Sequence, residues 1–275
     1  MITLKKIFDF YINSSIHVAI AVVSLVKITF IKFHILDGDL YMYFSFVGTI
    51  VGYNFVKYAN VSRLYHRRLT KSMTTINVLT GICLVVCVYL GYMFSLKAIL
   101  YLLPFIFLTI LYVIPVFPKK KNLRSIAGVK IFIIGITWMG LTVLLPFIYA
   151  EESIHYDIII ECVQRFLFVV VLMLPFEIRD LQYDSKELVT IPQKMGVTRT
   201  KVFGSIILGL FLVLTICKDA LSFVEILGTV LITILSLLFL WATRKKQSVY
   251  FCSFWVESIP IMWLLILILI QTLFK

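Results

Sequence analysis

The chain has 275 residues, of which 61% are hydrophobic, and it carries a net charge of +12 with a mean hydropathy of +1.02. Apolar runs of about 18 residues or more recur along its whole length, as in membrane-spanning helices. The composition therefore excludes a soluble protein and predicts one integral membrane bundle over residues 1–275. The charge requires no nucleic-acid partner, because basic loops beside anionic lipid headgroups explain it, and no recognition helix or basic–aromatic strip is present.

The apolar runs divide into about nine spans when about 20 residues are taken to cross roughly 30 Å of hydrocarbon. The first run follows Lys5 and Lys6 and lacks a small-residue cleavage site, so we expect a span there and not a removed signal peptide. The sequence thus predicts an all-α, polytopic membrane protein. The expected spans are Asn13–Lys32, Leu40–Tyr58, Thr75–Phe94, Leu96–Val116, Ser125–Phe147, Tyr156–Phe176, Lys201–Cys217, Leu221–Trp241 and Val249–Gln271.

Charged residues alternate between the loops on the two sides of these spans. Loops after the odd-numbered spans hold most of their charge as Asp and Glu, whereas loops after the even-numbered spans are rich in Lys and Arg. Excess Lys and Arg mark the cytoplasmic side, so we predict a cytoplasmic N-terminus and an outer C-terminus, and we expect a bacterial cytoplasmic membrane. The basic residues of the even-numbered loops include Arg63, Arg67, Arg68, Lys71, Lys119, Lys120, Lys121, Arg124, Lys186, Lys194, Arg199, Arg244, Lys245 and Lys246.

Acidic residues are rare on the predicted cytoplasmic side, and most of them lie in one short segment. Of the 14 acidic residues in the chain, those expected at or near this face are Asp9, Glu177, Asp180, Asp184 and Glu187. If the segment stays helical beyond the membrane, Asp180, Asp184 and Glu187 share one face, where like charges repel. Neither the cysteines nor the histidines show the spacing of a zinc site.

Two kinds of positive charge are able to compensate this repulsion. One is a divalent cation, since Mg²⁺ is typically held by one or two carboxylates together with waters and substrate phosphate oxygens. The other is a set of neighbouring bases, of which Arg179, Lys186 and Lys194 are close in sequence. The spacing alone leaves both interpretations open.

The same segment resembles a family motif. A pair of aspartates four residues apart, followed by Thr-Ile-Pro and a glycine at the cytoplasmic end of the sixth of nine spans, resembles the second aspartate-rich motif of the UbiA superfamily of membrane prenyltransferases. The matching residues are Asp180, Asp184, Thr190, Pro192 and Gly196. A second stretch, from Tyr112 through Pro118, Lys119 and Lys120, resembles the family's Tyr–Pro–Lys/Arg segment after the fourth span, and Gly128 and Trp138 follow it.

The resemblance implies a fold, a reaction and a set of site residues. Members are nine-helix bundles that move a prenyl group from a prenyl diphosphate to an aromatic, quinone-precursor or other lipid acceptor with the help of Mg²⁺. The resemblance also implies that Asp180 and Asp184 are catalytic and bind the metal. The residues implied to bind the diphosphate are Asn54, Lys57, Lys119, Lys120 and Arg179.

The chain departs from the family at the first aspartate-rich motif. Members carry Asn-Asp-x-x-Asp-x-x-x-Asp after the second span, and here only Asn54 is kept, while Phe55, Tyr58 and Ser62 occupy the three aspartate positions. A second metal would normally rest on those carboxylates, so basic residues such as Lys57 are expected to supply the missing positive charge.

Two functions from different classes follow from this departure. The first is an intramembrane prenyltransferase that uses the intact second motif. The second is a catalytically degenerate relative that binds or presents a prenyl lipid or phospholipid. Glu257, inside the last expected span, is a further functional candidate because charges at that depth are costly, although a position near the outer interface or a pairing with a tyrosine would also explain it.

Overall fold

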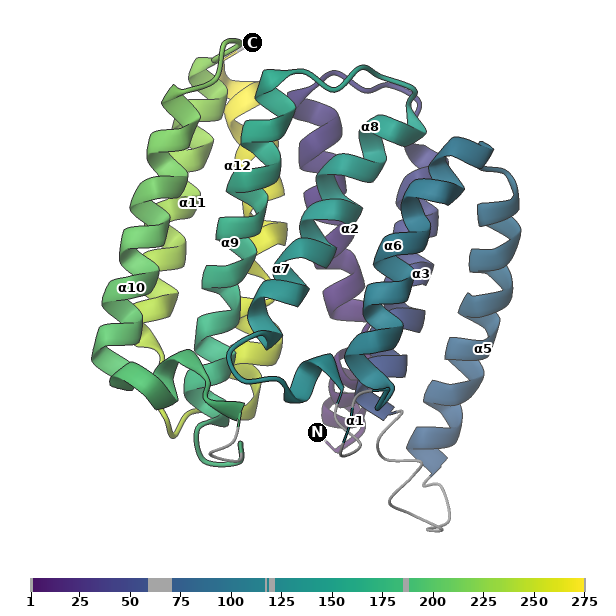
Figure 1. The fold of residues 1–275 in the computed structure, drawn as a ribbon, viewed down its shortest axis with the longest axis vertical. Helices are drawn as coiled ribbons and strands as arrows, with labels where there is room; N and C mark the ends of the chain where they lie inside the picture. Colours follow the sequence, from purple (N-terminus) through teal and green to yellow (C-terminus); the bar gives the residue numbers. More distant parts are fainter. Residues whose placement is uncertain (1, 59–70, 117, 119–121, 185–187, 275) are drawn as a thin grey trace.

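The computed structural model describes residues 2–58, 71–116, 118, 122–184 and 188–274, and within these ranges the regular structure is entirely helical (Figure 1). A short 3₁₀ turn occupies Leu123–Ser125, and π-helical segments occupy Gly140–Leu144 and Phe251–Val256. The α-helices are α1 (Ile2–Asn13), α2 (Ile16–Lys32), α3 (Asp39–Tyr58), α5 (Lys71–Tyr92), α6 (Leu96–Val113), α7 (Lys130–Met139), α8 (Leu145–Tyr149), α9 (Tyr156–Asp180), α10 (Ile191–Ile216), α11 (Phe223–Ala242) and α12 (Ile259–Leu273).

Seven helical stretches in the described ranges are long and apolar enough to cross a membrane, and the bent pair α1 and α2 brings the number to eight. The protein is therefore an integral, polytopic, all-helical membrane protein, as the sequence predicts. The count of about nine spans differs by one, at α3. This helix has 20 residues but is not among the stretches apolar enough to span, since Asp39, Asn54 and Lys57 interrupt its apolar sequence.

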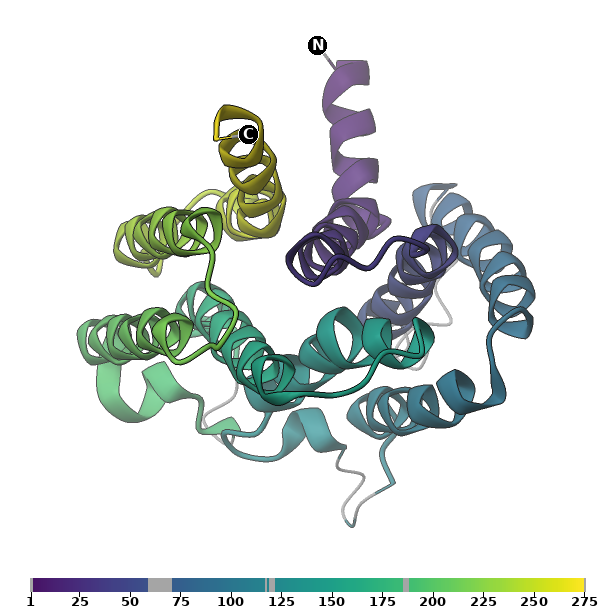
Figure 2. The same cartoon turned by 90° about the horizontal axis from the view of Figure 1, so that it is seen from above.

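The helices run side by side and place the chain ends at opposite ends of the bundle. Figure 1 shows the N-terminus at the same end as the turn after α9, with the C-terminus at the other end. In Figure 2, α2, α3 and α5 pack in series on one side, α7, α9, α10, α11 and α12 follow on the other, and α12 returns to α2. The placement of both termini agrees with the predicted alternation of the loops, while the assignment of the cytoplasmic side stays a prediction.

The main hydrophobic core lies in the half of the bundle built by α2, α7 and α9 to α12. At its centre the ring of Trp263 lies 4.9 Å from that of Phe168 and 5.8 Å from that of Phe211, measured between ring centroids. Helices α5 and α6 are much less buried, with 11% and 17% of their span residues inside the protein. Their apolar faces therefore remain available to lipid.

Several helix boundaries differ from those expected. The first span is preceded by α1, which meets α2 at an angle of 55°, and Ser15 at the junction has φ 65°. Helix α10 begins at Ile191, well before the expected Lys201, because Pro192 occupies its first turn and the side chain of Gln193 accepts a hydrogen bond from the Thr190 amide (2.9 Å). Gly196, with φ 80°, interrupts this helix near its start.

A buried ion network ties four segments together at the end of the bundle farthest from Asp180. Glu161 on α9 contacts Lys218 at 2.6 Å, Lys32 at 2.9 Å and Arg165 at 2.9 Å, and Glu225 on α11 contacts Lys218 at 2.6 Å. Burial acts to lower the pKa of Lys218, but the carboxylates of Glu161 and Glu225 outweigh burial and raise that pKa. The charges are thus paired inside the protein, as hydrocarbon surroundings require.

We expect Glu161→Gln to lower the stability of the folded protein by about 3–5 kcal/mol, because three buried cations lose their shared carboxylate. The measurement is the thermal unfolding midpoint of the purified protein in detergent. Glu152→Gln is the matched control, since it removes an exposed carboxylate at the same end of the bundle. Equal midpoints for the two variants would contradict a stabilising network.

Candidate functional site

The two aspartates of the second motif lie together at the end of α9. Helix α9 ends at Asp180, and the Asp184 amide donates a hydrogen bond to the Asp180 carbonyl at 2.8 Å, so one further helical turn carries Asp184 back to the same side. The side chains meet at a common cation: Lys130 Nζ lies 4.0 Å from Asp180 Oδ2 and 3.7 Å from Asp184 Oδ2. Glu187, expected on this face, is outside the described residues.

Arg179 supplies a second positive charge to this pair. Its Nε and Nη2 atoms donate to the two carboxylate oxygens of Asp180 at 2.8 Å and 3.3 Å, and its guanidinium lies over the Phe176 ring. Asp184 is less well satisfied, because its Oδ2 atom is buried and has no hydrogen-bond partner among the described residues. A buried carboxylate oxygen without a donor is costly and is a natural position for a ligand or ion.

Glu177 connects the same end of α9 to the start of α10. Its carboxylate is buried and accepts a hydrogen bond from the Ile191 amide at 3.3 Å. It also lies within electrostatic range of Lys130 and Asp184. Glu177, Asp180 and Asp184 therefore form an acidic group that faces two bases, Lys130 and Arg179.

The donor set of this site suits one Mg²⁺ ion shared with a phosphate. Mg²⁺ is commonly bound by one or two carboxylates when substrate phosphates complete its coordination. The Asp184 Oδ2 atom, which is buried without a hydrogen-bond partner among the described residues, fits such an ion. Within the described ranges, no group of three or more His, Cys, Asp or Glu side chains is arranged around a metal position. The residues thus fit a metal held jointly with a ligand and not a centre made by protein alone.

Residues at the end of α3 form hydrogen bonds to the junction between α1 and α2. In the side chain of Asn54, Oδ1 accepts a hydrogen bond from the Ser15 hydroxyl at 2.8 Å. Its Nδ2 donates to the Ser14 carbonyl at 3.2 Å and to the Thr80 hydroxyl at 2.8 Å. The first aspartate-motif positions therefore serve the local fold, since Tyr58 likewise donates to the Asn13 carbonyl at 3.0 Å. Ser62, Lys119 and Lys120 lie outside the described residues.

Lys57 and Glu257 bring further charge to the Asp180 end. Lys57 donates to the Ile12 carbonyl at 3.3 Å, and Glu257 lies within electrostatic range of both Lys57 and Arg179. Glu257 directly follows the π-helical segment Phe251–Val256, whose extra residue changes the direction of the side chains that come after it. Glu257 therefore lies at the same end of the bundle as Asp180, where it stays a functional candidate.

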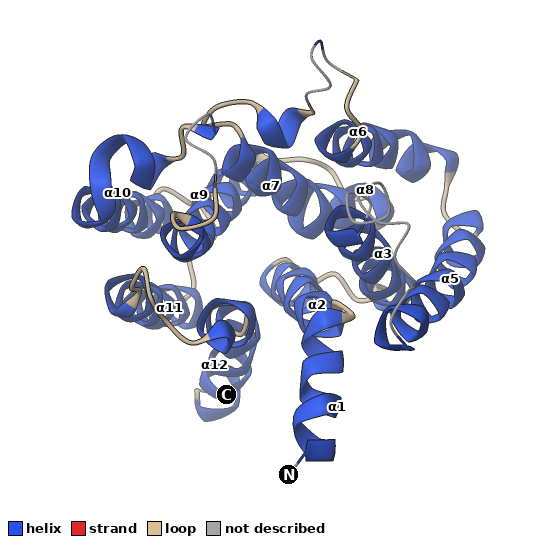
Figure 3. Cartoon of the chain, turned by 90° about the horizontal axis from the view of Figure 1, so that it is seen from below, coloured by secondary structure: helices blue, strands red, loops and turns tan. Residues whose placement is uncertain are grey.

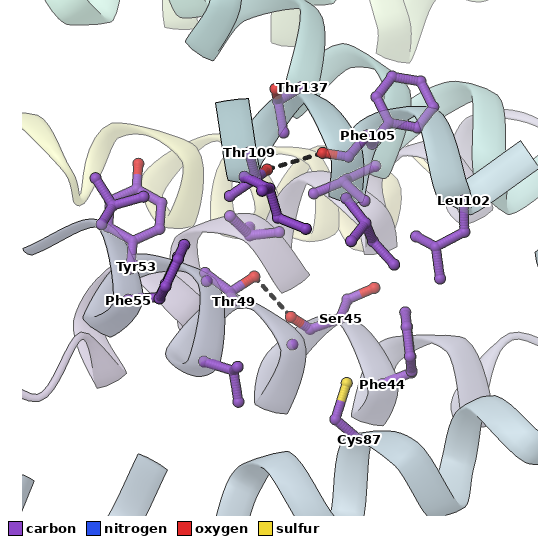
Figure 4. Close-up of a pocket in the computed structure, with 18 of the residues that line it drawn as sticks. Phe44, Ser45, Thr49, Tyr53, Phe55, Cys87, Leu102, Phe105, Thr109 and Thr137 are labelled. Carbon is purple, nitrogen blue, oxygen red and sulfur yellow. Dashed lines mark hydrogen bonds between the residues drawn. The ribbon is translucent and has the colours of Figure 1, made fainter. Parts of the chain in front are cut away.

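A mainly apolar groove lies near these charges, since Tyr112, which lines it, is within electrostatic range of Glu177 and Asp184. Its volume is about 690 Å³, and residues of α3, α5, α6 and α7 line most of it (Figure 4). The serine and threonine hydroxyls in its wall donate to backbone carbonyls of their own helices at 2.6–2.9 Å, and the phenol groups of Tyr53, Tyr92 and Tyr112 also line it. The serine and threonine hydroxyls belong to Ser45, Thr49, Thr109 and Thr137.

The groove has a polar end and an aromatic end. Ile133 and Ile134 line it and follow Lys130 by three and four residues, so they lie on the face of α7 that carries Lys130. At the other end Phe44 packs on Phe94 with a centroid distance of 4.7 Å. From Phe44 to Val56 the lining of α3 extends for about 18 Å at roughly 1.5 Å per residue. Figure 3 shows the backbone of the bundle from below, the end at which the N-terminus lies.

Neither the role of Lys130 nor the groove was predicted from the sequence. Lys130 falls inside the expected span Ser125–Phe147, and its presence as a lone charge in an apolar run was the signal available. The groove follows from the arrangement of four helices and has no signature in any one of them.

Comparison with known proteins bears on the fold. No family model matches the chain, and no curated protein matches it in sequence. A solved structure of digeranylgeranylglyceryl phosphate synthase, a UbiA-superfamily membrane prenyltransferase, matches with a TM-score of 0.56 over 97% of this chain and 97% of that chain, at 15% sequence identity. The chain has a UbiA-like fold. The fold predicted from the Asp180 segment is therefore confirmed, and the UbiA-like bundle extends over nearly all of the chain.

We expect Asn54→Ala to lower stability by about 2–3 kcal/mol, because three hydrogen bonds at the α1–α2 break are lost. The measurement is the thermal unfolding midpoint, with Asn13→Ala as control, since Asn13 is an exposed neighbour at the same break. The binding of pyrophosphate is measured in parallel. A variant of unchanged stability that no longer binds pyrophosphate would instead favour the diphosphate-binding role that the family resemblance implies.

Proposed function

We propose that this protein is an intramembrane prenyltransferase, which moves a prenyl group from a prenyl diphosphate to an aromatic, quinone-precursor or other lipid acceptor with the help of Mg²⁺. The observation that carries the proposal is that a charged surface and an apolar surface lie near each other. A cluster of two carboxylates and two bases, around Asp180 and Asp184, lies near a groove lined mostly by apolar and aromatic side chains, one of which, Tyr112, is within electrostatic range of Asp184. A prenyl diphosphate has the same polarity, with a charged head on a long apolar chain.

The reaction breaks the bond between C1 of the prenyl chain and a diphosphate oxygen. The electron pair leaves with pyrophosphate, the acceptor nucleophile forms a new bond to C1, and the acceptor loses a proton. Because the barrier arises mainly from the charge that develops on the leaving group, preorganised positive charge in a site that excludes water lowers it. Arg179 and Lys57 are the described bases assigned to this role, and Lys119 and Lys120 join them on the family resemblance alone.

Asp180 and Asp184 are assigned to hold Mg²⁺, which would neutralise charge on the diphosphate. The groove is assigned to the prenyl chain, since its serine and threonine hydroxyls are bonded internally and most of its other lining side chains are apolar or aromatic. The name of the structurally similar synthase refers to a glyceryl phosphate lipid, which places a lipid acceptor among the first to test. The site is assigned to the cytoplasmic face, on the distribution of Lys and Arg between the loops.

One observation favours a second function, the binding or presentation of a prenyl lipid or phospholipid without turnover. At the positions of the missing aspartates, Phe55 lines the groove and Tyr58 bonds to the backbone of Asn13. This side of the site contributes no carboxylate, so a second metal has no support from those positions. Such a protein would bind the diphosphate and release it unchanged.

A transfer assay separates the two functions. The protein in nanodiscs is given labelled geranyl, farnesyl and geranylgeranyl diphosphates, a panel of quinone-precursor and lipid acceptors, and Mg²⁺. We expect a prenylated product whose rate of formation falls roughly 10²- to 10³-fold in Asp180→Asn and Asp184→Asn, because the leaving-group charge loses its metal. Asp219→Asn, an exposed carboxylate at the opposite end, serves as control. Binding of the diphosphates without any product would favour the second function.

A substitution inside the groove tests where the chain binds. A Cβ atom at Gly52 meets nothing within 4 Å, so Gly52→Leu fits the fold while filling part of the groove. We expect the affinity for geranylgeranyl diphosphate to fall about tenfold or more from crowding, with the affinity for pyrophosphate unchanged. Gly81→Leu is the matched control, because Gly81 is equally open and does not line the groove. Equal effects of the two variants on geranylgeranyl diphosphate would place the chain elsewhere.

A further inference from the structure

We infer that Lys130 is a resident counter-cation of the Asp180–Asp184 pair, that it competes with a divalent metal ion for these carboxylates, and that on release it binds a diphosphate oxygen. The inference rests on the proposed diphosphate site and deepens it. It assigns to Lys130 a role that neither the second aspartate motif nor its resemblance to the family includes.

The first argument is the position of the ammonium group. Lys130 Nζ lies 4.0 Å from Asp180 Oδ2 and 3.7 Å from Asp184 Oδ2, so it contacts both carboxylates from one point. A metal shared by two carboxylates occupies the same kind of position. The ammonium and the metal therefore cannot both be there.

The second argument is that the ammonium is held loosely. Both separations exceed the limit of a hydrogen bond, and Asp184 Oδ2 remains without a hydrogen-bond partner among the described residues. By contrast, Lys218 in the ion network at the opposite end approaches two carboxylate oxygens at 2.6 Å each. A lysine on a flexible four-carbon stem can leave a contact of the looser kind by rotating its side chain.

The third argument is the balance of charge. The three carboxylates of this site face only two bases, so a divalent cation that enters alone turns a small net negative charge into a net positive one. The side chains of Lys130, Arg179, Asp180 and Asp184 are at most 30% exposed, so water screens this excess weakly. A diphosphate removes this excess and accepts the displaced ammonium. Metal and diphosphate are therefore expected to favour each other's binding, as reciprocal coupling requires.

The direction in which Lys130 moves follows from α7. Its side chain stands one turn before Ile133 and Ile134, which line the start of the groove. A prenyl diphosphate whose chain enters the groove places its head at that turn. The ammonium thus passes from the carboxylates to the phosphate by a change of rotamer, while the helix stays in place.

The test measures Mn²⁺ binding without turnover, from the free Mn²⁺ signal in electron paramagnetic resonance of protein in nanodiscs and without any substrate. We expect Lys130→Gln to bind Mn²⁺ at least about tenfold more tightly than the unmodified protein, because the competing cation is gone. Lys130→Arg should resemble the unmodified protein, and Lys130→Gln combined with Asp184→Asn should lose the gain. Lys201→Met is the matched control, since Lys201 lies at the same end and bonds to the Trp241 carbonyl at 2.7 Å.

Pyrophosphate binding to the same variants supplies the second readout. Lys130→Gln should bind pyrophosphate about tenfold more weakly in the presence of Mg²⁺, opposite in sign to its effect on Mn²⁺. Weaker or unchanged Mn²⁺ binding in Lys130→Gln would overturn the inference, and so would unchanged pyrophosphate binding.

Chemical labelling of lysines in the unmodified protein tests the displacement of Lys130 without a substitution. Mg²⁺ together with inorganic pyrophosphate should change the labelling of Lys130 severalfold and leave Lys201 unchanged, whereas equal labelling of Lys130 with and without them would count against the inference. A failed transfer assay accompanied by these binding results would reject the proposed function and retain the counter-cation.

Discussion

The need to pair every buried charge inside the bundle shapes this protein more than any other interaction, because hydrocarbon offers neither counter-ions nor water. Helix α9 shows this most clearly, since it carries ionised side chains near both ends. At one end Glu161 is surrounded by three cations at 2.6–2.9 Å, so its carboxylate is closely paired and we call this network closed. At the other end Asp180 and Asp184 share Lys130 at 3.7–4.0 Å, and the network is open to a ligand.

The difference between the two ends separates structural support from function. The closed network joins α2, α9, α11 and the turn after α10, next to the main core around Trp263. Removal of any member leaves a buried charge, so the network resists change. The open cluster lies near the groove, part of whose wall is formed by the little-buried helices α5 and α6. The well-buried helix α9 therefore carries charged residues at both ends, while the less buried half of the bundle contributes to the groove wall.

Much of the fold and part of the site were predictable from the sequence. The apolar runs located the helices because spanning a membrane requires long apolar segments, and the pair Asp180 and Asp184 stood out against basic loops. Lys130 was not predictable as a partner, since it lies about 50 residues away and its contact depends on how α7 packs against α9. Asn54 was assigned to diphosphate, whereas its hydrogen bonds join segments 39 and 26 residues apart. Such pairings depend on tertiary packing, which local patterns do not encode.

The loss of the first aspartate motif and the presence of Lys130 have one common explanation in electrostatic terms. A site with two sets of carboxylates carries a negative charge that needs more than one divalent ion, and those ions then hold the diphosphate. Here Phe55 adds hydrocarbon to the groove on that side, and the remaining aspartates are balanced by Lys130 and Arg179. Fixed cations thus replace part of the metal charge. In the proposed function, such a site would bind a diphosphate with a single metal ion, and its affinity would depend on the lysine that the metal displaces.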